Sequence, residues 1–321
     1  MRLLLLVCLC FIIIVLPSAV LAQFSGNVIG DNVAIVLDPQ YPNPGDIFTA
    51  TIEDYAINSS NATYVWLVNG VEETAVRGQR SIKVKAGEVG VPLTLTSRLV
   101  FTDKPTIEVT QVITPYYLDV IIEPQTYVPV FYAGRALPVH GSLVNLIALV
   151  HGKNGLIDPS TYTYSWQLNN KSVFGGPKKG ASQAQITVPF GRTSLITLSI
   201  VDQNGVAVAR RVFSIPSVPV KIQFYEVSTL YGLSKRAIGS SLTLTGNSSN
   251  IRAVPYNLDT RANSFNLFTE WKIDSQTVNS GDDPFEINLA RNKQGSARVN
   301  FKLRNVASLL QGDEASFIVK F

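Results

Sequence analysis

Apolar and polar residues alternate along most of this chain, so that every second residue in many short runs is hydrophobic. Around Trp166, the side chains of Tyr162, Tyr164 and Trp166 share one face of the run, and the polar residues between them share the other. This period of two is typical of a β-strand that buries one face. After the first 22 residues no run repeats with the spacing of an amphipathic helix. The pattern therefore predicts an all-β protein.

The pattern around Trp166 occurs three times. Trp66, Trp166 and Trp271 are separated by 100 and 105 residues, which is about the length of one small domain. The first two are followed by Asn69-Gly70 and Asn169-Asn170, residue pairs that favour a tight β-hairpin. Further strands are predicted in the same order in each copy, at residues 47–52, 82–85, 143–150, 186–189, 195–201, 206–215, 251–255 and 285–289.

About seven short strands with one central tryptophan in about 100 residues indicate an immunoglobulin-like sandwich. The predicted fold is all-β, with three tandem Ig-like (PKD/fibronectin-III-like) β-sandwich domains after an N-terminal signal helix. The domains are expected at residues 23–115, 116–217 and 218–321, joined by short linkers that contain proline. Trp66, Trp166 and Trp271 are the expected structural core residues. End-to-end stacking of three such domains would give a rod of about 100 Å.

The first residues predict export. Arg2 precedes an unbroken apolar run at residues 3–16, and Val20-Leu21-Ala22 provides a cleavage site, so residues 1–22 are expected to be a signal peptide. The alternative is an uncleaved anchor, in which residues 3–16 tether the protein to a membrane. The expected location is periplasmic, cell-surface or extracellular. Cys8 and Cys10 both lie in this segment, so the exported chain would have no disulfide, thiolate metal site or cysteine nucleophile.

Charge is unevenly distributed along the chain, whose formal net charge is +4. Residues 27–115 hold six Lys and Arg against ten Asp and Glu, residues 116–217 hold eight against four, and residues 218–321 hold twelve against nine. Solvated surfaces account for each value alone. The opposite signs at the two ends would also favour head-to-tail contact between copies.

The second and third copies share a segment ahead of their second strand. Residues 131–138, which begin Phe131-Tyr132, correspond to residues 230–239, which begin Leu230-Tyr231. With this segment, the chain resembles a family of uncharacterised secreted proteins with three Ig-like or PKD-like domains from candidate-phylum bacteria of the Parcubacteria type. The stretches that carry the resemblance are residues 41–46, 126–138, 224–237 and 308–321. The resemblance implies a cell-surface or periplasmic component, in some cases encoded near pilus genes, and it transfers no established activity or site.

Candidate catalytic chemistry is sparse. Histidine is the usual proton carrier near neutral pH, and His140 and His151 are the only two in the chain. No glycine-flanked serine elbow accompanies them, and two histidines without a carboxylate cluster do not predict a zinc site. The adjacent carboxylates Glu72-Glu73 and Asp282-Asp283 are interpreted as solvated turn residues rather than a glycosidase pair or a calcium site. We therefore expect no enzyme, no cofactor and no metal.

Candidate binding residues are also few. Lys178-Lys179 and Arg210-Arg211 are tight basic pairs but form no stripe with interleaved aromatic residues, which argues against a nucleic-acid interface. Five aromatic residues gather near the start of the second domain, and they are predicted either to pack at the boundary between the first two domains or to bind a glycan or protein partner. These residues are Tyr116, Tyr117, Tyr127, Phe131 and Tyr132.

Export, three repeated β-modules and little catalytic chemistry together favour a non-enzymatic surface or envelope protein. It would act as a rod that binds a partner or scaffolds an assembly such as a pilus apparatus. The expected partners are proteins of the cell envelope or further copies of this chain. A carbohydrate-binding or adhesive module and a self-associating surface coat are the alternatives.

Overall fold

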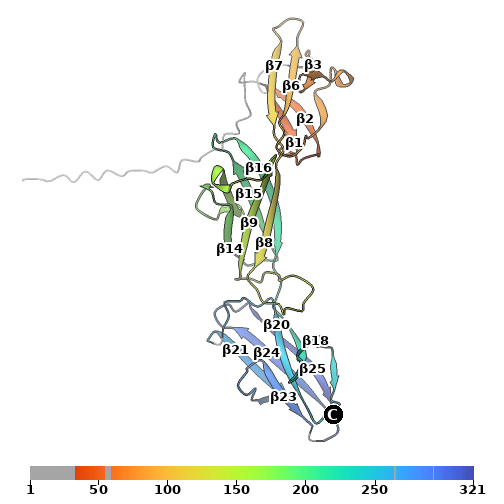
Figure 1. The fold of residues 1–321 in the computed structure, drawn as a ribbon, viewed down its shortest axis with the longest axis vertical. Helices are drawn as coiled ribbons and strands as arrows, with labels where there is room; N and C mark the ends of the chain where they lie inside the picture. Colours follow the sequence, from red (N-terminus) through yellow and green to blue (C-terminus); the bar gives the residue numbers. More distant parts are fainter. Residues whose placement is uncertain (1–32, 55–58, 264, 292) are drawn as a thin grey trace, which may run out of the picture.

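The computed structural model describes residues 33–54, 59–263, 265–291 and 293–321 (Figure 1). The predicted signal peptide and its helix, at residues 1–22, lie outside the described residues. Within these, every regular element is a β-strand apart from two single 3₁₀ turns, η1 (Thr74–Val76) and η2 (Pro159–Thr161). The prediction of an all-β protein is confirmed.

Six sheets pair into three sandwiches that follow one another along the chain (Figure 1). The strands of the first sandwich are β1 (Val33–Asp38), β2 (Ile47–Asp54), β3 (Thr63–Val68), β4 (Val71–Glu72), β5 (Ser81–Lys85), β6 (Leu93–Val100) and β7 (Ile107–Ile113). Those of the second are β8 (Tyr117–Pro124), β9 (Leu143–Gly152), β10 (Gly155–Leu156), β11 (Thr163–Leu168), β12 (Lys171–Ser172), β13 (Lys178–Lys179), β14 (Gln183–Thr187), β15 (Thr193–Val201) and β16 (Ala207–Pro216). Those of the third are β17 (Lys221–Ser228), β18 (Gly232–Ile238), β19 (Ser241–Thr243), β20 (Ser248–Tyr256), β21 (Leu267–Ile273), β22 (Gln276–Val278), β23 (Glu286–Ala290), β24 (Ser296–Asn305) and β25 (Gly312–Lys320).

One strand order recurs in all three sandwiches. The first sheet of each contains the strands β1-β2-β5, β8-β9-β14 or β17-β20-β23, and the facing sheet contains β3-β6-β7, β11-β15-β16 or β21-β24-β25. All of these neighbours pair antiparallel. This arrangement of a three- or four-stranded sheet on a larger sheet that holds the tryptophan strand is Ig/fibronectin-III-like, as the sequence predicts.

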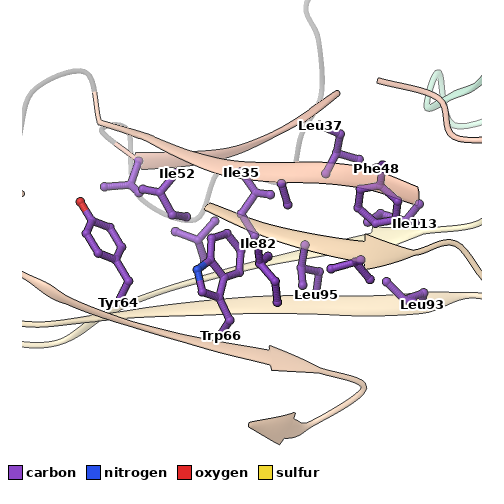
Figure 2. Close-up of a cluster of buried hydrophobic side chains, with 14 of the residues drawn as sticks. Ile35, Leu37, Phe48, Ile52, Tyr64, Trp66, Ile82, Leu93, Leu95 and Ile113 are labelled. Carbon is purple, nitrogen blue, oxygen red and sulfur yellow. The ribbon is translucent and has the colours of Figure 1, made fainter. Parts of the chain in front are cut away.

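A tryptophan lies at the centre of each core. In the first sandwich Trp66 is enclosed between the two sheets, with Ile35 and Ile82 on the opposite side (Figure 2). Trp66 and Trp166 are 0% exposed and Trp271 is 2% exposed. Each indole N–H donates a hydrogen bond to a backbone carbonyl downstream, at 2.9, 2.9 and 3.1 Å. Each tryptophan thus fills the core and satisfies its one polar group.

The turn after each tryptophan strand is built in the same way. Asn69, Asn169 and Asp274 adopt positive φ angles, as do the residues that follow them, which gives the two-residue hairpins β3–β4, β11–β12 and β21–β22. Their side-chain oxygens accept hydrogen bonds from backbone N–H groups of the neighbouring strand at 2.9, 2.8 and 2.8 Å. A short polar residue therefore sets the turn and fixes it to the sheet.

The chain between β8 and β9, residues 125–142, leaves the second sandwich and packs on the third. We call this segment the strap. Its Val139 is 1% exposed and belongs to the core of the third sandwich, beside Phe224 and Trp271. The expected division placed residues 116–217 in the second domain, and it did not anticipate that part of this range packs on its neighbour.

Candidate functional site

Polar and aromatic side chains gather at the junction between the second and third sandwiches. β8 ends at this junction, and the strap then crosses to the outer face of the sheet that contains β17 and β20 (Figure 1). There the ring of Phe131 lies 5.5 Å from that of Tyr225, and the ring of Tyr132 lies 5.2 Å from that of Tyr256, both edge to face. The hydroxyls of Tyr225 and Tyr256 share a buried hydrogen bond. Burial, followed by this bond, raises the pKa of Tyr256 above its usual range.

Backbone hydrogen bonds hold both ends of the strap. The N–H of Tyr127 donates to the carbonyl of Leu258 at 2.8 Å, and the N–H of Asn257 donates to the carbonyl of Tyr127 at 2.7 Å. At the return end, the N–H of Leu137 donates to Oδ1 of Asn257 at 3.1 Å. Asn257 therefore binds both ends of the strap from one turn of the third sandwich, at a positive φ of 62° that asparagine tolerates.

Three polar side chains of the third sandwich lie beside the strap, and we call Asp259, Arg261 and Gln311 the latch. Asp259 is 4% exposed, and its carboxylate accepts hydrogen bonds from the guanidinium of Arg261, the shortest at 2.6 Å. The same Arg261 Nη2 also donates to the carbonyl of Gly141 at 2.7 Å, and Nε2 of Gln311 donates to the carbonyl of His140 at 2.9 Å. Two side chains of the third sandwich thus hold carbonyls at the end of the strap.

The protonation state of Asp259 follows from these contacts. Burial opposes ionisation of the carboxyl, but hydrogen bonds from the side chain and backbone of Arg261 outweigh it, so the pKa of Asp259 is lowered. A carboxyl whose pKa is lower in the folded than in the unfolded state stabilises the fold above its unfolded pKa. That stabilisation is lost as the pH falls through the folded pKa.

We expect the third sandwich to lose this contribution in acid. At pH 7, Asp259→Asn should be less stable to denaturant than the parent protein, and the difference should shrink as the pH falls below about 4, the usual pKa of an unfolded aspartate. Unfolding measured by tryptophan fluorescence between pH 7 and pH 2 checks this. Asp282→Asn, which changes an exposed loop carboxylate, serves as the matched control. A difference for Asp259→Asn that stays constant over this range would contradict the role of the latch.

A cavity of about 400 Å³ opens on the third sandwich next to the latch. The strap contributes one lining residue, Tyr127, whose side chain is 43% exposed. The other lining residues are Pro255, Leu258, Asp259, Thr260, Ala262, Asn263, Leu267, Thr269, Pro284 and Phe285. The volume is in the range of small-molecule sites, and the walls are mainly apolar with a few hydroxyl and amide groups. Asp259, the one carboxylate of the lining, is engaged by Arg261.

The junction between the first and second sandwiches contains a close backbone contact at Gly90. The N–H of Gly90 donates to the carbonyl of Pro115 at 2.7 Å, and Gly90 has a φ of +68°. A Cβ at this position would lie 2.3 Å from the backbone nitrogen of Lys153 in the second sandwich. Only glycine permits this approach.

The structure separates the five aromatic residues predicted to gather near the start of the second domain. Tyr116 packs edge to face on Tyr162 at 6.4 Å, inside the second sandwich, and Tyr117 lies 5.8 Å from the ring of His151. Burial, and then a hydrogen bond with Tyr116, raises the pKa of Tyr162 to about 12. The other three, Tyr127, Phe131 and Tyr132, lie on the strap at the opposite end of β8. They pack at the boundary between the second and third sandwiches rather than between the first two.

The remaining sequence candidates do not gather into one site. His140 precedes β9 and His151 lies near its end, and Glu72 pairs with Arg77 at 3.5 Å. Asp283 pairs with Arg252 at 3.1 Å and accepts from the N–H of Phe285. Arg211 on β16 holds Asp119 and the carbonyl of Leu118 on β8, and Lys178 lies over the ring of Phe174. In the part of the chain that the structure describes, no three His, Cys, Asp or Glu side chains gather as metal ligands.

Sequence reasoning missed Asn257 and the latch residues Asp259, Arg261 and Gln311. Asn257, Arg261 and Gln311 bind backbone groups more than a hundred positions away in the sequence, and Asp259 holds Arg261. Single polar residues between strands carry no pattern that distinguishes such a contact from a solvated loop. One feature of the sequence could have indicated this contact. The strap contains the apolar sequence Leu137-Pro138-Val139, which the alternation of β8 and β9 does not explain.

No family model and no curated protein matches this chain. Solved structures of tandem β-sandwich proteins do. Three N-terminal domains of the highly immunogenic outer capsid protein (Hoc) of bacteriophage RB49 match 90% of this chain and 98% of their own, at 14% identity and a TM-score of 0.26. The central fibronectin-III array of RIM-binding protein matches 90% and 96%, at 12% identity and a TM-score of 0.29.

A third match is the SGBP-B protein of a Bacteroides ovatus mixed-linkage glucan utilization locus, solved with a mixed-linkage heptasaccharide. It covers 91% of this chain and 71% of its own, at 12% identity and a TM-score of 0.22. These are proteins built from immunoglobulin or fibronectin-III-like modules. No ligand or partner transfers from them to this chain.

Proposed function

We propose that this protein is an exported, non-enzymatic spacer, a rod that holds a binding or assembly element at a fixed distance from its point of attachment. The observation that carries the proposal is the second junction, where the latch holds the strap and the strap inserts Val139 into the core of the third sandwich. Tandem modules joined by a bare linker move relative to one another. A junction held by these contacts suits a protein that must keep its two sandwiches at a fixed angle and distance.

The arrangement of the three sandwiches supports this use. They lie end to end rather than folded against one another (Figure 1). The first junction adds a second close contact, at Gly90. The hydrophobic run at residues 3–16 supports export, with either a cleaved signal or a retained anchor. Among the described residues, no helix is long and apolar enough to cross a membrane.

Labelling in intact cells tests export. Asn204 is exposed in the loop between β15 and β16, and the chain holds no cysteine after Cys10, so Asn204→Cys introduces the single thiol of the chain beyond residue 10. We expect a membrane-impermeant maleimide to label this thiol in cells that make the protein with its own N-terminus. Val144→Cys, at a position that is 0% exposed, is the matched control and should stay unlabelled until the protein is denatured. Labelling of Asn204→Cys only after lysis would contradict export.

A carbohydrate-binding role is the second candidate, and the cavity beside the latch favours it. An exposed tyrosine with neighbouring hydroxyl and amide groups, as in Tyr127, Thr260 and Asn263, is suited to a sugar ring. Titration of soluble oligosaccharides into the protein, read by chemical-shift or calorimetric change, tests this role. Tyr127→Ala should abolish any binding that takes place in the cavity.

A further inference from the structure

The turn between β17 and β18 carries two neighbouring apolar side chains that are exposed. β17 begins beside the strap, where Lys221 pairs with Tyr256, and it ends about 23 Å further along. The turn that follows, residues 229–231, therefore lies at the end of the third sandwich that faces away from the second (Figure 1). Leu230 is 77% exposed and Tyr231 is 85% exposed. We call this turn the tip.

Local hydrogen bonds hold the backbone of the tip. The N–H groups of Leu230 and Tyr231 both donate to Oγ of Ser228, each at 3.2 Å. Gly232, the next residue, has a φ of +70°, and a Cβ there would meet no atom within 4 Å apart from its chain neighbours. The turn is thus fixed by its own hydroxyl, while its two apolar side chains stay in solvent and bury little against their own sandwich.

Cations surround the tip. β20 starts at this end of the sandwich, and its first residue Ser248 pairs with Ala290, the last residue of β23. The loop after β23 leads to Ser296 on β24, which pairs with Lys320, the last residue of β25. Five exposed cations belong to β18, to this loop and to the end of β25: Lys235, Arg236, Arg291, Lys293 and Lys320.

Few carboxylates offset these cations. In the described part of the β17–β18 hairpin, the β23–β24 loop and residues 318–320, Glu226 is the only carboxylate side chain, and it accepts a hydrogen bond from Oγ of Ser249 at 3.1 Å. Asp274, in the turn between β21 and β22, accepts from the N–H of Arg298 at 2.8 Å. The end of the sandwich that carries the tip is therefore net positive.

We propose that the tip docks on an anionic lipid bilayer, with Leu230 and Tyr231 inserted among the headgroups and the five cations on lipid phosphates. Leucine gains from the acyl boundary, and a tyrosine ring sits at headgroup level with its hydroxyl in water. Each Lys or Arg close to an anionic membrane strengthens binding about fivefold. A bilayer offers a projecting turn both an apolar interior and a negative surface, without the matching pocket that a folded protein partner would need.

Co-sedimentation with lipid vesicles tests the proposal. The chain is used from residue 23 onward, because the apolar run at residues 3–16 would itself bind vesicles. We expect binding to vesicles of equimolar phosphatidylglycerol and phosphatidylcholine, and binding about tenfold weaker or less to phosphatidylcholine alone. Added salt should weaken the binding to the anionic vesicles.

Two double variants locate the contact. Leu230→Ser with Tyr231→Ser should bind the anionic vesicles about tenfold or more weakly than the parent. The matched control is Phe265→Ser with Leu309→Ser, whose side chains are 96% and 73% exposed at the opposite end of the third sandwich, and it should bind as the parent does. All four side chains are exposed, so unfolding followed by tryptophan fluorescence should be unchanged in both variants, which separates docking from folding.

An environment-sensitive fluorophore reports insertion directly. Thr229→Cys places the fluorophore beside Leu230 and Tyr231 and keeps both side chains. Its emission should shift to the blue when the anionic vesicles are added. The same fluorophore at Asn204→Cys, in the second sandwich, should not respond.

Three results would overturn the proposal. They are a parent protein that does not bind the anionic vesicles, a tip variant that binds as the parent does, and binding without a blue shift at position 229. The last result would mean that the cations hold phosphates while the tip stays in water. Each of them would leave the cysteine labelling in cells unchanged, so this proposal and the proposed function fail separately.

Discussion

Trp166→Ala is expected to destabilise the second sandwich by about 3–5 kcal/mol, a large share of the stability of a domain this size. Trp166 is fully buried between the two sheets, and its indole N–H bonds the carbonyl of Ala181. Removing the ring leaves a cavity that a rigid sandwich cannot close and an unpaired carbonyl beside it. Hydrogen exchange measured by mass spectrometry on peptides from β11 and β15 reports the change within this sandwich.

Phe190→Ala is the matched control for that experiment. Phe190 lies in the loop after β14 and is 80% exposed, so the loss of its ring should leave the exchange of β11 and β15 within about 0.5 kcal/mol of the parent. The first sandwich should not respond to Trp166→Ala, because its core is separate. Unchanged protection of β11 and β15 in Trp166→Ala would show that the tryptophan does not support the core.

Val139→Asp is the second large effect, and it is expected in the third sandwich although residue 139 lies in the chain of the second. The valine is 1% exposed among the core residues of the third sandwich. An unpaired carboxylate there should cost about 3–5 kcal/mol, unless the strap detaches. In either case, peptides from β17 and β20 should exchange faster, while those from β11 and β15 keep their protection.

Val130→Asp provides the comparison on the same strap. Val130 is fully exposed, so the same chemical change should have no effect on the exchange of β17 or β20. If Val139→Asp instead accelerated exchange in β11 and left β17 unchanged, the strap would belong to the second sandwich in solution. The account of the junction would then be wrong.

The repeated sandwich could be predicted because its determinants are local and periodic. Strand alternation, the central tryptophans and the Asn69-Gly70 and Asn169-Asn170 turns each act within a few residues, and the structure contains the corresponding strands and hairpins. The predicted strand at residues 143–150 is found as β9, extended by two residues. At these positions, interactions between residues that are close in sequence are sufficient to determine the structure.

The junctions could not be predicted, because they depend on contacts between distant parts of the chain. The aromatic residues of the strap were recognised as a group with Tyr116 and Tyr117, since all five are close in sequence. The length of β8 then separates them, carrying Phe131 and Tyr132 to the far end of the sandwich. Only the tertiary structure shows that Asp259 and Arg261 meet the end of the strap.

The most direct test of the rod is the distance between two spin labels across the second junction. Thr187→Cys on β14 and Gln276→Cys on β22 are exposed positions on the second and third sandwiches, and both are suitable for nitroxide labels. Pulsed electron resonance should give one narrow distance distribution, because the strap, the latch and Val139 hold the two sandwiches as one body. A broad distribution, of the kind given by two modules on a free linker, would contradict the account.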